Sequence, residues 1–283
     1  MISLRITCSR ILVALPLVLC MGTATASSAA EPPQKADDLL RTAVANEKLS
    51  ANDGYFSWVD RLQKTKGSVT KIMVSTPQGI LGRTVAINDA PLSADDRKQD
   101  DDRINRLLDP AKMRDKASKQ REDQQRIERL LMALPDAFHC EYSATVHDDR
   151  NVRLECSPNS HFSAPNYESQ VLLGMKAVIL VDRDESRIAR IEGNLFKDVN
   201  FGWGFIGRLN HGGRIEITQS KVAGKHWGIQ RMQLIFDGRI VMVKPLHIEE
   251  TETSWDYHPV PSMGVAQALQ YLRASTPNLK PTH

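Results

Sequence analysis

Short segments in which apolar and polar residues alternate recur along most of the chain, and turn-forming residues separate them. A period of two places the apolar side chains of a segment on one face, which is the pattern of a half-buried β-strand. Consecutive strands joined by short turns pair as antiparallel hairpins. We therefore predict an α+β fold that is mainly antiparallel β. The predicted strands are residues 68–75, 81–88, 140–146, 152–156, 175–181, 187–196, 214–222, 227–236 and 240–252.

Proline and glycine mark the predicted turns. Pro77 and Gly79 supply the backbone angles of a turn between the first two strands. The pair Asp237-Gly238 is typical of a tight hairpin turn, so we predict one between strands 227–236 and 240–252. Pro245 has no N–H to donate, which predicts an edge or bulge position for it.

Three glycines, Gly202, Gly204 and Gly207, spell the dinucleotide-binding pattern G-x-G-x-x-G. That motif requires a helix beginning at its glycines and an acidic residue about 20 positions later. Residues 214–218 alternate as a strand instead, and residues 222–227 contain no carboxylate. We predict that these glycines permit a sharp bend between paired strands.

Helical periodicity appears in three places. Residues 35–49 predict a short helix, and Ser262 is predicted to cap a second one near the C-terminus. The predicted buried faces of these two helices consist of Leu39, Leu40, Ala43 and Val44, and of Val265, Ala268, Leu269 and Leu272.

The third helical region is a charged insertion, residues 93–134. It holds eleven Lys/Arg and ten Asp/Glu between residues 95 and 129, a mixture that favours solvated helical faces. Ser93 and Asp96 are placed for a capping interaction. Pro110 is predicted to separate two helices, and Pro135 to stop the second.

The first 30 residues have the layout of a secretory signal peptide. Arg5 and Arg10 precede an apolar run over residues 11–21, and small residues follow to Ala30. The run is shorter than the roughly 20 residues that span a bilayer, so no stable transmembrane segment is predicted, with a permanent anchor as the alternative. Cleavage after Ala30 is favoured over Ala26. Lipid attachment at Cys20 stays open, although the preceding Leu19 is not a small residue.

The chain without its leader is almost neutral, with 35 Lys+Arg against 34 Asp+Glu. A nucleic-acid-binding domain is clearly positive, and a protein that binds anionic membranes clusters its basic residues, so neither partner is predicted. Residues 31–283 are enough for one domain with a substantial core. We predict a single domain.

Cys140 and Cys156 are the two cysteines outside the leader, and an even pair in an exported chain predicts a disulfide. A hairpin folded about Asp148 brings the two together. The same register places Tyr142 opposite Leu154 and Ala144 opposite Val152, so the apolar faces coincide. Two free thiols or metal ligation are the alternatives, although no second Cys/His cluster has zinc spacing.

A search for catalytic chemistry finds no motif. The eight histidines lack a common spacing, and no H-E-x-x-H, G-x-S-x-G or Walker pattern occurs. The run 100–102 of three aspartates lacks the alternation and glycine of a calcium loop. Asp182, Asp184 and Glu185 fall in a predicted turn and are interpreted as solvated, and the tryptophans as core or rim residues. We predict no enzyme activity, no cofactor and no metal site.

Residues 173–260 resemble uncharacterised secreted bacterial proteins related to the outer-membrane lipoprotein carrier (LolA-like) superfamily. The matching segments are residues 179–182, 188–192, 199–204, 226–229 and 237–239. The resemblance implies a curved antiparallel half-barrel with helices over its concave face, and an apolar cavity between them. The charged insertion and the Cys140/Cys156 hairpin depart from the carriers, so no ligand-binding residue is carried over.

Two hypotheses about function follow. The first is a non-enzymatic periplasmic, secreted or outer-membrane-associated protein that binds a lipid, a lipoprotein acyl chain or another hydrophobic ligand in the half-barrel. The alternative is a structural or protein-interaction module of the cell envelope that uses the charged insertion as its partner surface.

Overall fold

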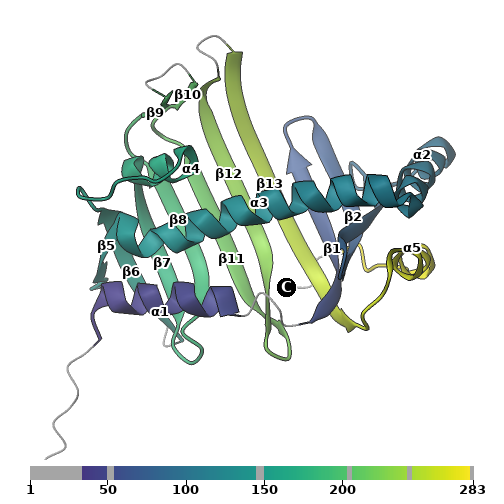
Figure 1. The fold of residues 1–283 in the computed structure, drawn as a ribbon, viewed down its shortest axis with the longest axis horizontal. Coiled ribbons are helices and arrows are strands. Elements are labelled where there is room, and N and C mark those ends of the chain that lie inside the picture. The colour runs from purple at the N-terminus through teal and green to yellow at the C-terminus, as the bar shows by residue number, and fades with distance from the viewer. Residues whose placement is uncertain (1–33, 50–53, 145–149, 203–205, 241–243, 281–283) are drawn as a thin grey trace, which may run out of the picture. The chain divides into compact units, whose positions relative to one another are not determined.

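The computed structural model describes residues 34–49, 54–144, 150–202, 206–240 and 244–280. A 13-stranded antiparallel sheet, open at both edges, runs in the order β4-β3-β2-β1-β13-β12-β11-β8-β7-β6-β5, with β9 and β10 attached to β12 (Figure 1). This confirms the predicted α+β class. The strands are β1 (Tyr55–Lys64), β2 (Gly67–Thr76), β3 (Gly79–Ile87), β4 (Ala90–Pro91), β5 (Phe138–Tyr142), β6 (Asn151–Pro158), β7 (Met175–Asp182), β8 (Ile188–Leu195), β9 (Val199–Phe201), β10 (Gly207–Leu209), β11 (Arg214–Ala223), β12 (His226–Ile240) and β13 (Lys244–Val260).

Within the described ranges, five α-helices and two short 3-10 helices accompany the sheet. The α-helices are α1 (Ala36–Leu49), α2 (Ala94–Asn105), α3 (Pro110–Ala137), α4 (Tyr167–Gln170) and α5 (Val265–Ala274), and the 3-10 helices are η2 (Arg106–Leu108) and η3 (Val171–Gly174). The leader, residues 1–30, lies outside the described residues and stays a prediction.

One hydrophobic core lies between α1 and strands β5 to β8. Leu40 and Ala43 of α1 are fully buried there, together with Leu154 of β6 and Ile179 of β7. Ile179 begins a row of directly paired residues that crosses the sheet. The row continues through Ile191, Ile217, Met232, Glu252, Leu62 and Val69. Since paired residues share a face, all of these side chains lie on the α1 side of the sheet.

A second core lies at the other end of the sheet, and on its opposite face. Ile72 and Val74 of β2 are buried there against Leu269 and Leu272 of α5. Along β2 these residues alternate with Val69, which belongs to the α1 side. Helix α5 therefore covers the face that α1 does not, whereas the resemblance had led us to expect both helices on one face.

The insertion forms two helices, as predicted. Ser93 caps α2 by accepting a hydrogen bond from the Asp96 N–H, and Pro110 occupies the first turn of α3 after the cap Asp109. Pro135 was predicted to stop α3, but the helix continues to Ala137. A proline removes one N–H, and so close to the helix end the single lost hydrogen bond is tolerated.

Two predictions, of a turn and of a helix cap, are wrong, and one strand was missed. Asp237-Gly238 forms no turn, because β12 continues to Ile240 and pairs these two residues with His247 and Leu246. Gly238 is needed for another reason: a Cβ there would lie 2.1 Å from the Arg208 carbonyl oxygen of β10. Strand β1 was not predicted at all. Helix α5 is capped at Gly264 and not at Ser262.

The predicted hairpin and glycine bend are present. Cys140 pairs with Cys156 and forms the disulfide, and Tyr142 pairs with Leu154, as the register required. The turn at Asp148 lies outside the described residues. β9 and β10 pair on either side of the glycine stretch, and Gly202 has a φ of 54° that favours glycine.

Candidate functional site

The central strands β11, β12 and β13 are apolar on one face and polar on the other. On the α1 side they carry Ile215, Ile217, Met232, Leu234, Phe236, Leu246 and Ile248. On the opposite side they carry mostly polar residues: Arg214, Glu216, Thr218, Arg231, Gln233, Thr251 and Thr253. All seven apolar side chains are only half-buried. A sheet face of this composition normally packs against another layer, and here the packing is incomplete.

Helix α3 bridges the two cores. Met113 and Ala117 in its first half are buried in the α5 core, and Leu134 and Ala137 near its end are buried in the α1 core. Every residue from 121 to 127 is exposed. Seven residues make about two helical turns, so the middle of α3 is exposed on all of its sides, and its contacts there are surface ion pairs such as that of Arg126 with Glu168.

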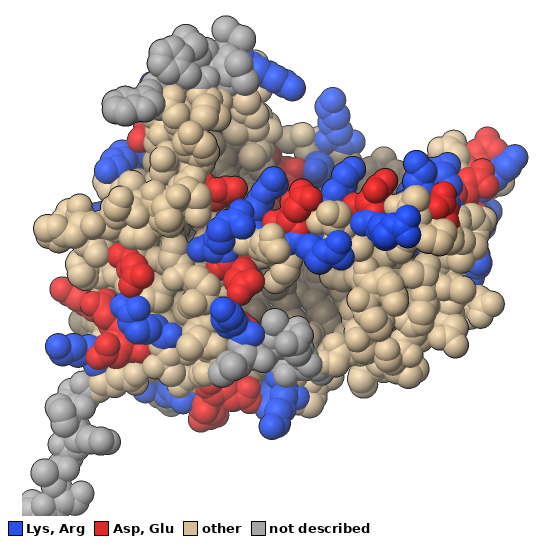
Figure 2. Space-filling model, viewed as in Figure 1, with Lys and Arg blue, Asp and Glu red and all other residues tan. Residues whose placement is uncertain are grey.

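The surface is hollowed beneath this bridge. Figure 2 shows the acidic and basic side chains of the bridging helix as a row, with the surface recessed below them. In the same view α3 passes in front of β12 and β13 (Figure 1). The hollow lies below the exposed turns of α3, and the half-buried apolar face of the central strands is on the α1 side of the sheet, the side on which α3 passes in front of β12 and β13. At its β2–β3 side the paired row ends in a pocket of about 260 Å³, lined in part by Leu62, Val69 and Ile87.

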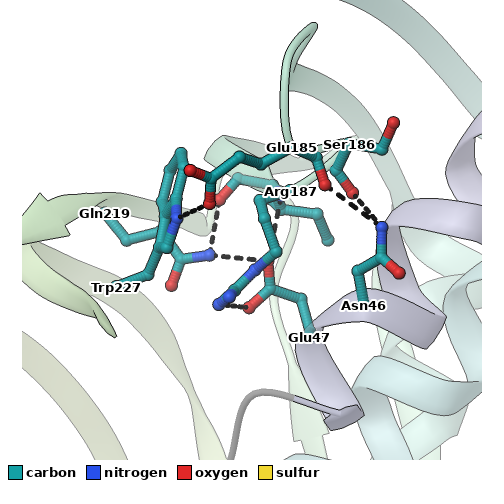
Figure 3. A network of polar contacts seen from close by, with 8 residues as sticks. Asn46, Glu47, Glu185, Ser186, Arg187, Gln219 and Trp227 are labelled. Carbon is teal, nitrogen blue, oxygen red and sulfur yellow. Dashed lines mark hydrogen bonds and ion pairs between the residues drawn. The ribbon is translucent and has the colours of Figure 1, made fainter. Parts of the chain in front are cut away.

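The end of α1 is locked to the sheet beside the central strands by a buried polar network (Figure 3). Arg187 donates two hydrogen bonds to the Glu47 carboxylate, at 2.9 and 2.8 Å, and both side chains are nearly buried. Glu47 also accepts from the Ile188 N–H and from the Gln219 amide, each at 2.9 Å. The Arg187 guanidinium lies 5.3 Å from the centre of the Trp227 ring. The Glu47 carboxylate thus accepts four hydrogen bonds, which offset the cost of burying its charge.

Further hydrogen bonds connect this network to the neighbouring turns. The Trp227 indole N–H donates to Glu185 at 2.8 Å, and Lys221 pairs with the same carboxylate. These bonds, Lys221 first, hold the pKa of Glu185 below its ordinary value. The Asn46 amide donates to the carbonyl oxygens of Glu185 and Ser186. Helix α1, the β7–β8 turn and the β11–β12 hairpin are thus fixed to one another.

Three acidic side chains interrupt the apolar face, and the first is Glu250 of β13, which pairs with Leu234 and with Lys64. Glu252 of β13 lies between Met232 and Leu62 in the paired row, and Asp60 follows on the same face of β1. Burial, and then the Asp60 carboxylate, raise the pKa of Glu252 to about 7. Asp60 accepts a hydrogen bond from the Ser254 hydroxyl at 2.9 Å. Glu252 therefore takes up a proton as the pH falls through about 7.

Aromatic rings lie next to the acid pair. Trp58 stacks on Tyr257 with ring centres 5.8 Å apart, and Phe56 stacks on His226 at 3.8 Å. The Tyr257 hydroxyl donates to the Ile229 carbonyl at 2.7 Å, and burial raises the pKa of this phenol. The rings therefore pack against one another next to the acid pair.

The residues weighed from the sequence as catalytic candidates do not converge. Asp182 is buried and not solvated as interpreted: it accepts the Asp184 and Glu185 N–H groups and so shapes the β7–β8 turn. Asp100 is buried against β3. His211, His247 and His258 each lie beside one or two surface carboxylates. Trp227 and Trp255 are buried, while Trp203, His147 and His283 lie outside the described residues.

Two further findings concern membranes and metals. None of the helices in the described ranges is long and apolar enough to cross a membrane. In the same part of the chain, no group of three or more His, Cys, Asp or Glu side chains is placed to hold a metal ion.

Comparison with known proteins adds little. No protein-family model matches the sequence, and no curated protein matches it. A crystal structure of a DUF1329 family protein from Desulfovibrio piger is similar over 81% of this chain and 95% of that chain, with 10% sequence identity and a TM-score of 0.27. So low a TM-score supports no argument about fold or function.

Proposed function

We propose that this protein is a non-enzymatic, exported binding protein that holds an elongated hydrophobic ligand, such as a lipid or acyl chain, in the hollow beneath α3. The observation that carries the proposal is the half-buried apolar face of β11, β12 and β13 under a helix whose middle residues, 121–127, are all exposed. A ligand that buries roughly 300 Å² of apolar area would gain about 7 kcal/mol before the entropy costs of binding.

Adjacent residues of β12 provide a matched test. Met232 faces the hollow and Gln233 faces the opposite side of the same strand. We expect the neutral probe N-phenyl-1-naphthylamine to bind the wild-type chain, and Met232→Arg to weaken that binding at least tenfold because it places a charge in the apolar face. Gln233→Arg should bind as the wild type does. Equal affinities for all three chains, or no binding at all, would contradict the proposal.

Export rests on the leader and is supported by the disulfide, since such bonds persist in oxidising compartments. N-terminal sequencing of the protein recovered from its native cells should begin at Glu31. A chain that still begins at Met1 would refute cleavage.

The alternative, a protein-interaction module, is favoured by one observation. Ile127 in the middle of α3 is 60% exposed on a helix that is otherwise highly charged. If a partner docks there, Ile127→Asp should abolish its co-purification and leave probe binding unchanged. Loss of probe binding alone would assign Ile127 to the hollow instead.

A further inference from the structure

Glu252 lies in the middle of the apolar face on which the proposed ligand binds. In the paired row it stands between Met232 of β12 and Leu62 of β1, and its side chain is half-buried. Helix α3 passes in front of β12 and β13 on this side of the sheet (Figure 1). An apolar ligand that spans Met232 and Leu62 therefore also covers the carboxyl group of Glu252.

The surroundings of Glu252 differ from those of the other deeply placed carboxylate, Glu47. Glu47 accepts four hydrogen bonds, two of them from the Arg187 guanidinium. Among the described residues, by contrast, no basic side chain forms an ion pair with Glu252. Its nearest charged neighbours are the carboxylates of Asp60 and Glu250. Since a charge on an apolar face is costly unless it is paired, the ionised form of Glu252 is the disfavoured one.

The charged groups on the surrounding elements do not change this balance. Glu250 is paired with Lys64 of β1, and Asp60 accepts a hydrogen bond from Ser254. The phenol of Tyr257 on β13 adds no charge, because burial raises its pKa. The cations on the β2 side are Lys71, which is paired opposite Asp60, Lys116 of α3 and Arg103 of α2. Residues 121–126 of α3 carry two basic and two acidic side chains, and β12 contributes Met232 and Leu234 to the row.

We propose that Glu252 is a proton switch of the hollow: the hydrophobic ligand binds while this carboxyl group is neutral and is released when it ionises. The inference rests on the proposed function, which assigns the ligand to this face of the sheet. An ionised carboxylate holds water around it, so covering it with an apolar chain costs free energy that covering a neutral carboxyl group does not. Proton and ligand therefore favour each other's binding by the same factor.

The pH range of the switch follows from the pKa of Glu252. Burial, then the charge of Asp60, raise that pKa to about 7. Below pH 7 the free protein already carries the proton, so its affinity for the ligand is highest there. Above pH 7 a proton must be taken up with the ligand. The affinity then falls by up to about tenfold for each pH unit, until the still higher pKa of the ligand-bound form is reached.

Fluorescence titration of residues 31–283 with N-phenyl-1-naphthylamine at pH 6 and pH 8 tests the switch. The Kd of the wild type should be about tenfold higher at pH 8 than at pH 6. Glu252→Gln should bind the probe equally at both pH values, with the affinity that the wild type has at pH 6. The matched control is Glu249→Gln on the same strand. Glu249 is exposed, pairs with Ile235 and faces the opposite side, so this variant should keep the pH dependence of the wild type.

The outcomes separate the switch from the proposed function. If none of the chains bound the probe at either pH, the proposed function would fail and the switch with it. Equal wild-type affinities at the two pH values, or a Glu252→Gln chain with wild-type pH dependence, would overturn the switch alone.

A second variant decides the matter if Glu252→Gln does not fold. Asp60→Asn removes the neighbouring negative charge that raises the pKa of Glu252. The affinity of this variant for the probe should therefore begin to fall at a lower pH than that of the wild type. An unchanged pH of onset would assign the titration to another group and overturn the proposal.

Discussion

Glu252 is the side chain whose chemistry is most altered by its position. It lies on an apolar face next to Asp60, and burial is the main reason that its pKa rises from 4.5 to about 7. A carboxyl group whose pKa is raised by folding costs no stability below its unfolded pKa. The cost grows between pH 4.5 and 7 and is complete above pH 7.

Glu252→Gln removes that cost. We expect the variant to have a higher melting temperature than the wild type at pH 8 and a similar one at pH 5. The measurement is thermal unfolding by circular dichroism at both pH values. Glu122→Gln, at an exposed position of α3, serves as the control and should show no such difference. A Glu252→Gln chain that is less stable than the wild type at pH 8 would contradict this expectation, because it would show that favourable interactions of the ionised carboxylate outweigh the cost of burying it.

Arg187 neutralises a nearly buried carboxylate. Arg187→Ala leaves Glu47 without its bidentate partner, so we expect a loss of about 3–5 kcal/mol in unfolding free energy. Arg190→Ala, three residues along in β8, is the matched control. Its ion pairs with Glu192 and Glu216 are half-exposed, and their loss should cost no more than about 1 kcal/mol. Urea unfolding measures both, and equal losses would mean that the network does not hold α1 in place.

Single residues were the hardest to interpret from the sequence. The Asp-Gly pair predicts a tight turn at Gly238, yet it is the absence of a side chain there that permits the close approach of β10. Asp182 was read as solvated because it precedes a turn, yet it is buried by accepting that turn's N–H groups. The roles of both residues depend on which parts of the chain pack against them, and the local sequence pattern does not contain that information. The disulfide could be predicted because two cysteines and one hairpin register allowed a single arrangement.

At the scale of elements, α3 is a helix held at its two ends. Its middle has only surface ion pairs, such as Arg126 with Glu168 at 3.8 Å, which contribute little. We expect amide hydrogen exchange over residues 121–127 to be faster than at Met113 and Leu134. Gln124→Gly should speed it further and cost about 1 kcal/mol, the usual glycine penalty in an exposed helix. If residues 121–127 were as well protected from exchange as the two ends of α3, the helix would not be held at its ends alone.

The β5–β6 hairpin depends on its disulfide. The bond closes a loop with a sequence separation of 16, so replacing both cysteines by serine should cost about 3 kcal/mol. Reduction of the wild type should cost a similar amount, and it provides the control for the serine side chains. A double variant as stable as the oxidised wild type would show that the α1 core alone holds the hairpin.

Most elements were predictable because their periodicity is regular, and β1 was missed because its periodicity is broken. Phe56 and Ser57 are both buried, and the pairing with β13 shifts between Ser57 and Val59. Across that bulge Asp256 has a φ of 60°. The extra residue of a β-bulge interrupts the alternation from which strands are recognised.

At the scale of the whole described chain, the strand order could not be predicted because β1 was not recognised in the sequence. β1 joins the β2–β3 hairpin to β13, and through it the sheet becomes continuous. Periodicity shows which residues share a face, but not which strands meet. The two cores on opposite faces, and the half-buried apolar stretch between them, therefore emerge only from the pairing. For the same reason none of the residues that form the hollow was predicted as a site.

The central claim is that the hollow beneath α3 holds a hydrophobic ligand. Native mass spectrometry of residues 31–283, purified from an oxidising compartment and compared with Met232→Arg, tests it most directly. We predict that the wild type carries an additional discrete mass that extracts into organic solvent, and that Met232→Arg has lost it while Gln233→Arg retains it. A wild-type chain without any bound mass, or an identical mass on all three chains, would contradict the account.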